Sequence, residues 1–117
     1  MSIEKFDRPW GSYINLVNEE GYKVKKLTIN PNSRLSLQSH NHRSEHWTVI
    51  KGKPKIQVGK DVLNLEINHH IYIPKQTLHR IENHTEEIAE IIEVQIGDYL
   101  EEDDIIRYED DYNRTIT

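Results

Sequence analysis

Short stretches of strand-like composition follow one another along this chain, and turn residues separate them. Such spacing is typical of a protein built from many short β-strands. The expected strands cover residues 12–18, 22–29, 35–40, 46–51, 55–58, 62–67, 71–73, 78–82 and 87–96. No segment keeps a helical period, and residues 101–106 are expected to form a turn. The pattern predicts an all-β sandwich or closed barrel.

Side chains that can bind a metal ion lie in two distant segments. Gln38, His40 and Glu45 belong to the first segment, and His79 belongs to the second. Alternate residues of a strand share a face, so Gln38 and His40 project together, whereas Glu45 is out of phase and requires a bend within residues 41–44. Donors from a strand end, a bend and a distant strand can meet at one mononuclear site. The alternatives are a partly buried histidine, a glutamine bonded to the barrel wall and a surface carboxylate.

Composition narrows the chemistry and the partners. The chain has no cysteine, so a metal must be held by N and O donors, which suit zinc, manganese, cobalt, nickel or iron. The net charge of −5 argues against a nucleic-acid partner. No apolar run approaches the ~20 residues of a membrane span and no signal-like segment opens the chain, so no membrane partner and a cytoplasmic location are expected. At 117 residues, the chain is expected to form a single domain over residues 1–117.

The two donor segments resemble the paired motifs of the cupin superfamily. Residues at the spacing of the first motif are Gln38, His40, Glu45 and Gly52, and those of the second are Pro74, His79 and Asn83. The chain departs from the motifs where Pro31 or Asn32, Asn68 and Gln76 replace glycines and where Gln38 replaces the first histidine. The glycine replacements affect turns, whereas the ligand set is kept.

The glutamine in place of histidine makes the chain similar to type II mannose-6-phosphate isomerases. This module is otherwise found behind a mannose-1-phosphate guanylyltransferase domain. The matching motifs are Arg-Pro-Trp-Gly-Ser-Tyr at 8–13, Tyr-Lys-Val-Lys at 22–25, Leu-Ser-Leu-Gln at 35–38, His-Arg-Ser-Glu-His-Trp at 42–47, Ile-Glu-Val-Gln at 92–95, and residues 99–105 followed by Arg107. The resemblance extends over residues 6–114, which is nearly the whole chain.

The resemblance implies a cupin fold, which is a double-stranded β-helix or jelly-roll barrel. It implies one divalent metal ion, with zinc expected first, bound by Gln38, His40, Glu45 and His79, and a catalytic role for Arg43. The implied reaction interconverts mannose 6-phosphate and fructose 6-phosphate through a cis-enediolate and supplies GDP-mannose and polysaccharide synthesis. The implied partners are a hexose phosphate and a second copy of the chain in a homodimer.

Two other functions stay open at this stage. The first is a catalytically weak module that binds a metal and a sugar phosphate. The second is a nucleotide-sugar epimerase on the same barrel, which needs no metal.

The acid/base group is left open by the sequence, and Glu93, His42 and a metal-bound water are the candidates. Glu93 and Gln95 alternate with apolar residues on the expected strand 87–96. If this polar face looks into the cavity, Glu93 is the candidate base, although a solvent-facing position is the ordinary one for a glutamate. His42 shares strand parity with His40 and is either a spare ligand or a partner of a ligand.

Several further side chains have expected roles. Additional phosphate candidates are Lys23, Lys25, Lys51, Arg80 and Arg107. Trp10, Tyr13 and Trp47 are expected to pack the core. The acidic run 101–104 is expected to cap a short turn and to stay in solvent.

Overall fold

The computed structural model describes residues 4–112 and 114, and its regular structure there is entirely β-strand. The strands are β1 (Lys5–Arg8), β2 (Gly11–Glu19), β3 (Tyr22–Ile29), β4 (Ser33–Arg34), β5 (Leu37–Ser39), β6 (Arg43–Lys51), β7 (Lys55–Val58), β8 (Asp61–Asn64), β9 (His70–Ile73), β10 (His79–Asn83), β11 (Ala89–Gly97) and β12 (Ile106–Glu109). The all-β prediction is confirmed. Within the described residues there is no helix with the length and apolar character needed to cross a membrane.

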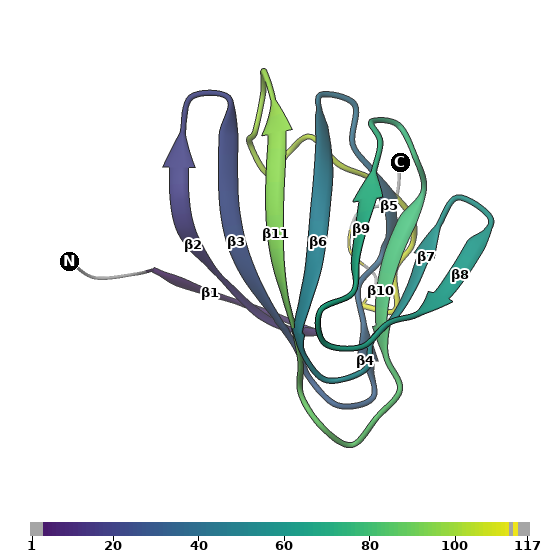
Figure 1. The fold of residues 1–117 in the computed structure, drawn as a ribbon. Helices are drawn as coiled ribbons and strands as arrows, with labels where there is room; N and C mark the ends of the chain where they lie inside the picture. The colour runs from purple at the N-terminus through teal and green to yellow at the C-terminus, as the bar shows by residue number, and fades with distance from the viewer. Residues whose placement is uncertain (1–3, 113, 115–117) are drawn as a thin grey trace.

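The strands form two antiparallel sheets. The first has the order β1-β2-β3-β11-β6-β9, and the second has the order β12-β5-β10-β7-β8 with β4 beside β10. In Figure 1 the first sheet spans the view from β2 to β9, and the strands of the second sheet stand at its β9 side. Strands far apart in sequence, such as β3, β11 and β6, are therefore neighbours, as a jelly-roll connection requires.

Most expected strands are confirmed, with changed bounds. β7 has the expected bounds, and the β2–β3 hairpin turns where expected. β6 begins at Arg43 and not at residue 46. Of the expected strand 35–40 only Leu37–Ser39 is a strand, β5, and the short β4 precedes the expected bounds. β1 and β12 were not expected; both are short and rich in charged residues, and pairing with β2 and β5 determines their conformation.

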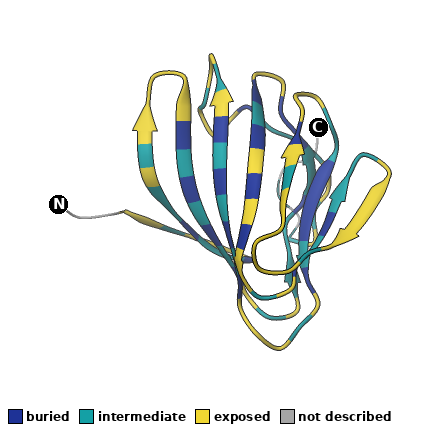
Figure 2. Ribbon diagram, in the orientation of Figure 1, coloured by how far each residue is buried: buried dark blue, intermediate teal, exposed yellow. Residues whose placement is uncertain are grey.

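On three neighbouring strands of the first sheet, β3, β11 and β6, the inward-facing residues change from apolar to polar at the same height along the strands. The register of β3, β11 and β6 aligns the buried residues in the rows Leu27–Ile91–Val49, Lys25–Glu93–Trp47 and Lys23–Gln95–Glu45. Figure 2 shows the buried positions alternating along these strands. The first row belongs to the hydrophobic core, and the two others bring charged side chains inside the barrel.

The apolar half of the interior holds the fold together. Its buried cluster consists of Trp10, Tyr13, Leu27, Ile29, Trp47, Val49, Ile56, Ile73, Ile81, Ala89 and Ile91. Each large side chain contributes roughly 1.5–3 kcal/mol through its removal from water. The predicted packing roles of Trp10, Tyr13 and Trp47 are thus confirmed, and the core is placed directly beneath the polar rows.

The replaced motif glycines keep a glycine-like backbone. Among residues 4–112 and 114, the non-glycine residues with positive φ are Asn32, Asn68 and Gln76, at 52°, 78° and 59° respectively. Asparagine tolerates this left-handed region, whereas a glutamine there is strained. The turn at Gln76 is nevertheless important, because its N–H donates to the carbonyl of His40 at 2.7 Å and links the β9–β10 connection to a predicted ligand.

We expect Gln76→Gly to raise the free energy of unfolding by about 0.5–1 kcal/mol, because glycine removes the strain and keeps the N–H that bonds to His40. Urea unfolding of both proteins measures the change. Lys75→Gly is the matched control on the same turn, where φ is not positive, and it should lose stability through the entropy of the unfolded chain. A Gln76→Gly protein less stable than the native one would contradict the strain at this position.

Candidate metal centre

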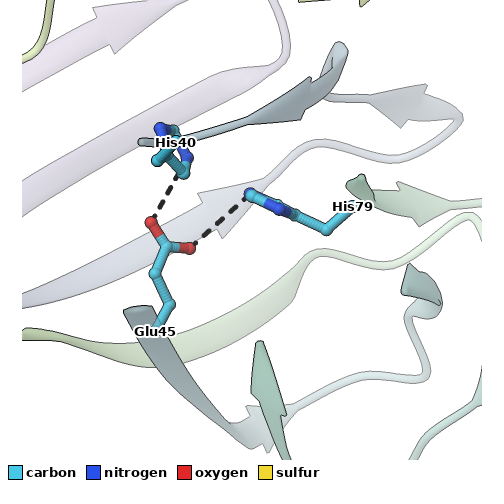
Figure 3. Close-up of side chains that lie close together, drawn as sticks. All are labelled: His40, Glu45 and His79. Carbon is cyan, nitrogen blue, oxygen red and sulfur yellow. Dashed lines mark ion pairs between the residues drawn. The ribbon is translucent and has the colours of Figure 1, made fainter. Parts of the chain in front are cut away.

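Three buried side chains from different strands converge at the polar end of the barrel. His40 follows β5, Glu45 lies on β6, and His79 opens β10; each is at most 3% exposed. The Nε2 atoms of His40 and His79 lie 3.4 and 3.8 Å from the two carboxylate oxygens of Glu45. Figure 3 shows both rings directed at this carboxylate. The three donor atoms all lie within 4.8 Å of one another, as a shared ion requires.

The predicted bend brings Glu45 into phase with His40, and an acidic residue stabilises it. Asn41 and His42 form the bend, and their N–H groups each donate to the Asp104 carboxylate at 2.9 Å. The Asp104 carbonyl also accepts a hydrogen bond from His40 Nδ1 at 2.6 Å. The prediction that the whole acidic run stays in solvent is therefore wrong for Asp104, which is buried against the candidate site.

Both imidazoles are oriented for metal binding. The Nδ1 atoms of His40 and His79 bond to the carbonyls of Asp104 and Thr77, so each Nε2 presents its lone pair to the interior. Burial lowers the pKa of His40 to about 4 and also lowers the pKa of His79. Both rings are therefore neutral near pH 7, which is the form that binds a metal.

Glu45 supplies the negative charge. Burial by itself raises its pKa, but the Arg43 guanidinium and the two imidazoles outweigh that effect and hold the pKa at about 2. Two neutral nitrogen donors and one ionised oxygen donor fit a divalent cation such as zinc or manganese.

Gln38 lies where the strand parity predicted. It lines the same cavity as His40, and its amide nitrogen donates to Ser36 Oγ at 3.0 Å. The amide oxygen is the atom that could reach a metal. Ligation by Gln38 stays a prediction.

Arg43 is buried within the donor set. Its Nε donates to Glu45 Oε2 at 2.8 Å, and its Nη2 lies 3.2 Å from His40 Nε2. A guanidinium in this position stabilises negative charge that develops beside the three donors.

Glu93 faces the cavity, so the solvent-facing alternative is wrong. Trp47 Nε1 donates both to Glu93 at 3.1 Å and to Glu45 at 3.0 Å, and Gln95 donates to the other oxygen of Glu93. Burial, reinforced by the charge of Glu45, raises the pKa of Glu93 to about 8. Glu93 is therefore largely protonated at neutral pH and can exchange a proton close to that pH.

Cations dominate the rest of the cavity, which has a volume of about 120 Å³. The lining basic residues are Arg8, Lys25, Arg43, Arg80, Arg107 and Arg114, and the lining carboxylates are Glu45, Glu93 and Glu102. Burial lowers the pKa of Arg107, and the charges of Arg114 and Arg8 lower it further. Its buried Nε has no hydrogen-bond partner among the described residues. Such crowding of cations suits an anionic ligand.

Not every candidate from the sequence lies in this cavity. His42 has 54% of its side chain exposed, 3.8 Å from Asp98, so neither of its two expected roles holds. Lys51 is exposed outside the cavity, and the buried Lys23 donates to the Leu100 carbonyl. Sequence reasoning missed Arg114 and did not single out Arg8, although Arg8 belongs to the motif at residues 8–13.

Comparisons with known proteins match this architecture. The family described as "Mannose-6-phosphate isomerase C-terminal" matches residues 2–110. The xanthan biosynthesis protein XanB of Xanthomonas campestris is 46% identical over 95% of this chain and 24% of its own length. The mannose-1-phosphate guanylyltransferase ManC of Salmonella typhimurium is 44% identical over 92% of this chain and 22% of its own length. The chain thus spans about a quarter of the length of these relatives.

The fold is that of a cupin. The crystal structure of Rru_A2000 from Rhodospirillum rubrum, a cupin-2 domain, superposes with a TM-score of 0.74, covering 87% of this chain and 78% of that protein at 15% identity. At this identity the likeness establishes the fold alone, and it confirms the predicted jelly-roll barrel.

We expect the protein to bind one zinc or manganese ion and Glu45→Gln to weaken the affinity at least about 100-fold, because the only ionised donor is lost. Isothermal titration calorimetry measures both. Because His40 has a pKa of about 4, the affinity should change little from about pH 8 to 6 and should fall only as protons compete near pH 4. His42→Ala is the control and should bind like the native protein; an equal loss in that variant would move the site away from Glu45.

Proposed function

Because the chain belongs to the mannose-6-phosphate isomerase C-terminal family, we propose that it is a metal-dependent isomerase interconverting mannose 6-phosphate and fructose 6-phosphate. The observation that carries this proposal is the meeting of His40, Glu45 and His79 beside Arg43 and Glu93 in one cationic cavity. Relatives named for xanthan and alginate biosynthesis support a role in supplying activated mannose for polysaccharides.

The reaction needs a stabilised enediolate and a proton carrier. A proton leaves the carbon beside the carbonyl, charge spreads over two adjacent oxygens, and a proton returns to the neighbouring carbon. A divalent ion on His40, Glu45, His79 and Gln38 would supply Lewis-acid stabilisation of those oxygens. Arg43, which contacts both His40 and Glu45, adds a fixed positive charge at the same place.

Glu93 is the residue that we assign to proton transfer. Trp47 and Gln95 hold its carboxyl group through both oxygens, so its position does not depend on substrate. With a pKa of about 8 it populates both protonation states near neutral pH, as a group that must take and return a proton needs to do.

The phosphate group requires a cationic wall beyond the cations at the metal donors, and Arg8, which donates to the Tyr13 hydroxyl at 3.2 Å, connects this wall to the Lys25 ammonium group over the same ring. Arg8, Arg107 and Arg114 line one part of the cavity, and the mutual repulsion of their charges contributes to the lowered pKa of Arg107. A phosphate dianion relieves that repulsion and accepts paired hydrogen bonds from guanidinium groups. The same wall would bind a free sugar poorly, which makes the phosphorylated hexose the proposed substrate.

A second candidate is a module that binds the sugar phosphate without turning it over. The observation in its favour is the cationic lining of the cavity, which supports binding of a sugar phosphate whether or not turnover follows. An isomerase assay combined with calorimetric binding of fructose 6-phosphate separates the enzyme from the binding module.

We expect purified protein loaded with zinc, manganese, cobalt, nickel or iron to convert fructose 6-phosphate into mannose 6-phosphate, detected by coupled assay or by NMR. Glu45→Ala should abolish turnover, because the charged donor is lost, whereas His46→Ala on the exposed outer face should retain it. Calorimetric binding of fructose 6-phosphate without turnover under all five metals would establish the binding module instead.

We expect Arg107→Gln to raise the KM for fructose 6-phosphate about tenfold and to leave kcat within about twofold, because a contact made equally in the ground and transition states is lost. Steady-state kinetics measure both constants. The control is Arg34→Gln, whose arginine pairs with Asp111 and Glu82 outside the cavity. A fall in kcat at unchanged KM would place Arg107 at the reacting carbons and not at the phosphate.

A further inference from the structure

A carboxylate of the chain itself lies among the cations at the edge of the cavity. Glu102 Oε1 and Oε2 each accept a hydrogen bond from Lys25 Nζ at 2.9 Å, and Oε2 lies 3.9 Å from Arg43 Nη1. The Glu102 side chain is 48% exposed, whereas those of Lys25 and Arg43 are 4% and 7% exposed. A half-exposed anion thus pairs with the buried Lys25 and lies beside Arg43, which also pairs with Glu45.

The cations form an anion site without Glu102. Lys25 Nζ lies 4.2 Å above the ring of Tyr13, and the Tyr13 hydroxyl accepts a hydrogen bond from Arg8 at 3.2 Å. Within the described residues, Glu102 is the only carboxylate paired directly with Lys25. A buried ammonium group without an anion is costly, so this position needs a negatively charged occupant at all times.

The surrounding turn lets the Glu102 side chain leave without unfolding the site. Glu102 lies between two fixed points: the Leu100 carbonyl accepts from Lys23 at 2.7 Å, and the Asp104 carboxylate holds the bend before β6. The flanking Glu101 and Asp103 are exposed. Rotation of one side chain into solvent therefore frees the cations while His40 keeps its hydrogen bond to Asp104.

We propose that the Glu102 carboxylate is a built-in competitor for the phosphate group, holding the anion position at Lys25, Arg43 and Tyr13 until a phosphorylated sugar displaces it. This inference rests on the proposed function for its physiological ligand. A phosphate dianion carries more charge and more acceptor oxygens than a carboxylate, so it can replace Glu102. A neutral sugar cannot replace Glu102, so this contact favours the binding of phosphorylated hexoses over free hexoses.

The test measures binding of inorganic phosphate by isothermal titration calorimetry. Glu102→Gln should bind phosphate about tenfold more tightly than the native protein, because the competing charge is gone and the side-chain volume is kept. Glu101→Gln removes the same charge from the same turn outside the cavity and should leave the affinity unchanged. In the double variant Lys25→Met/Glu102→Gln the gain should disappear, which assigns it to the Lys25 end of the cationic wall.

Glu102→Asp covers the case in which Glu102→Gln does not fold. It keeps the charge on the turn but withdraws it from Lys25, and its phosphate affinity should lie between those of the native protein and Glu102→Gln. An unchanged or weakened affinity in the folded variants overturns the inference. Because the phosphate titration requires no sugar and no turnover, it is independent of the isomerase assay. If the protein is an active isomerase but Glu102→Gln leaves the phosphate affinity unaltered, only the role of Glu102 is contradicted.

Discussion

The buried carboxylate of Glu45 organises the polar half of the barrel. It is 1% exposed, and a charge removed from water in this way must be compensated by its neighbours. Arg43 and Trp47 donate to its two oxygens at 2.8 and 3.0 Å, and two imidazoles approach within 3.4 and 3.8 Å. Loss of one partner from such a buried group costs about 3–5 kcal/mol. The arrangement is therefore rigid before any ligand enters.

The same charge sets the protonation of the groups around it. Burial lowers the pKa of His40 and His79, and the charge of Glu45 counteracts only part of that effect, so both rings stay neutral. The charge of Glu45 adds to burial in raising the pKa of Glu93, so this carboxyl keeps its proton. One anion with two neutral imidazoles and a neutral acid is a set that can accept a cation and move a proton.

Strand parity made part of this site predictable from the sequence, and the failures share a physical cause. Gln38 and His40 lie on one face as expected, and the bend that brings Glu45 to them lies within the predicted residues. The sequence left the orientation of Glu93 open, because the interior of the barrel is charged at that level. In the second half of β11, Glu93 and Gln95 face inward, whereas the apolar Ile92, Val94 and Ile96 face outward; this is the opposite of the usual pattern, in which the apolar face of a strand is the buried one. The contacts of Asp104 with Asn41 and of Glu102 with Lys25 join residues 63 and 77 positions apart, and no local pattern encodes them.

The charge of the whole chain and the charge of its cavity have opposite signs. The chain carries a net charge of −5, which disfavours an extended polyanion such as nucleic acid. Inside the barrel, six basic side chains and three carboxylates line the cavity; one carboxylate is protonated, and Arg80 and Arg114 also pair with Glu109 and Asp110. The exterior of the barrel is negatively charged and its small cavity is positively charged. Only a small anion can therefore enter the cavity. This combination supports the proposed sugar phosphate over a polymeric anion, and the register that aligns Lys25 and Glu93 on neighbouring strands contributes to it.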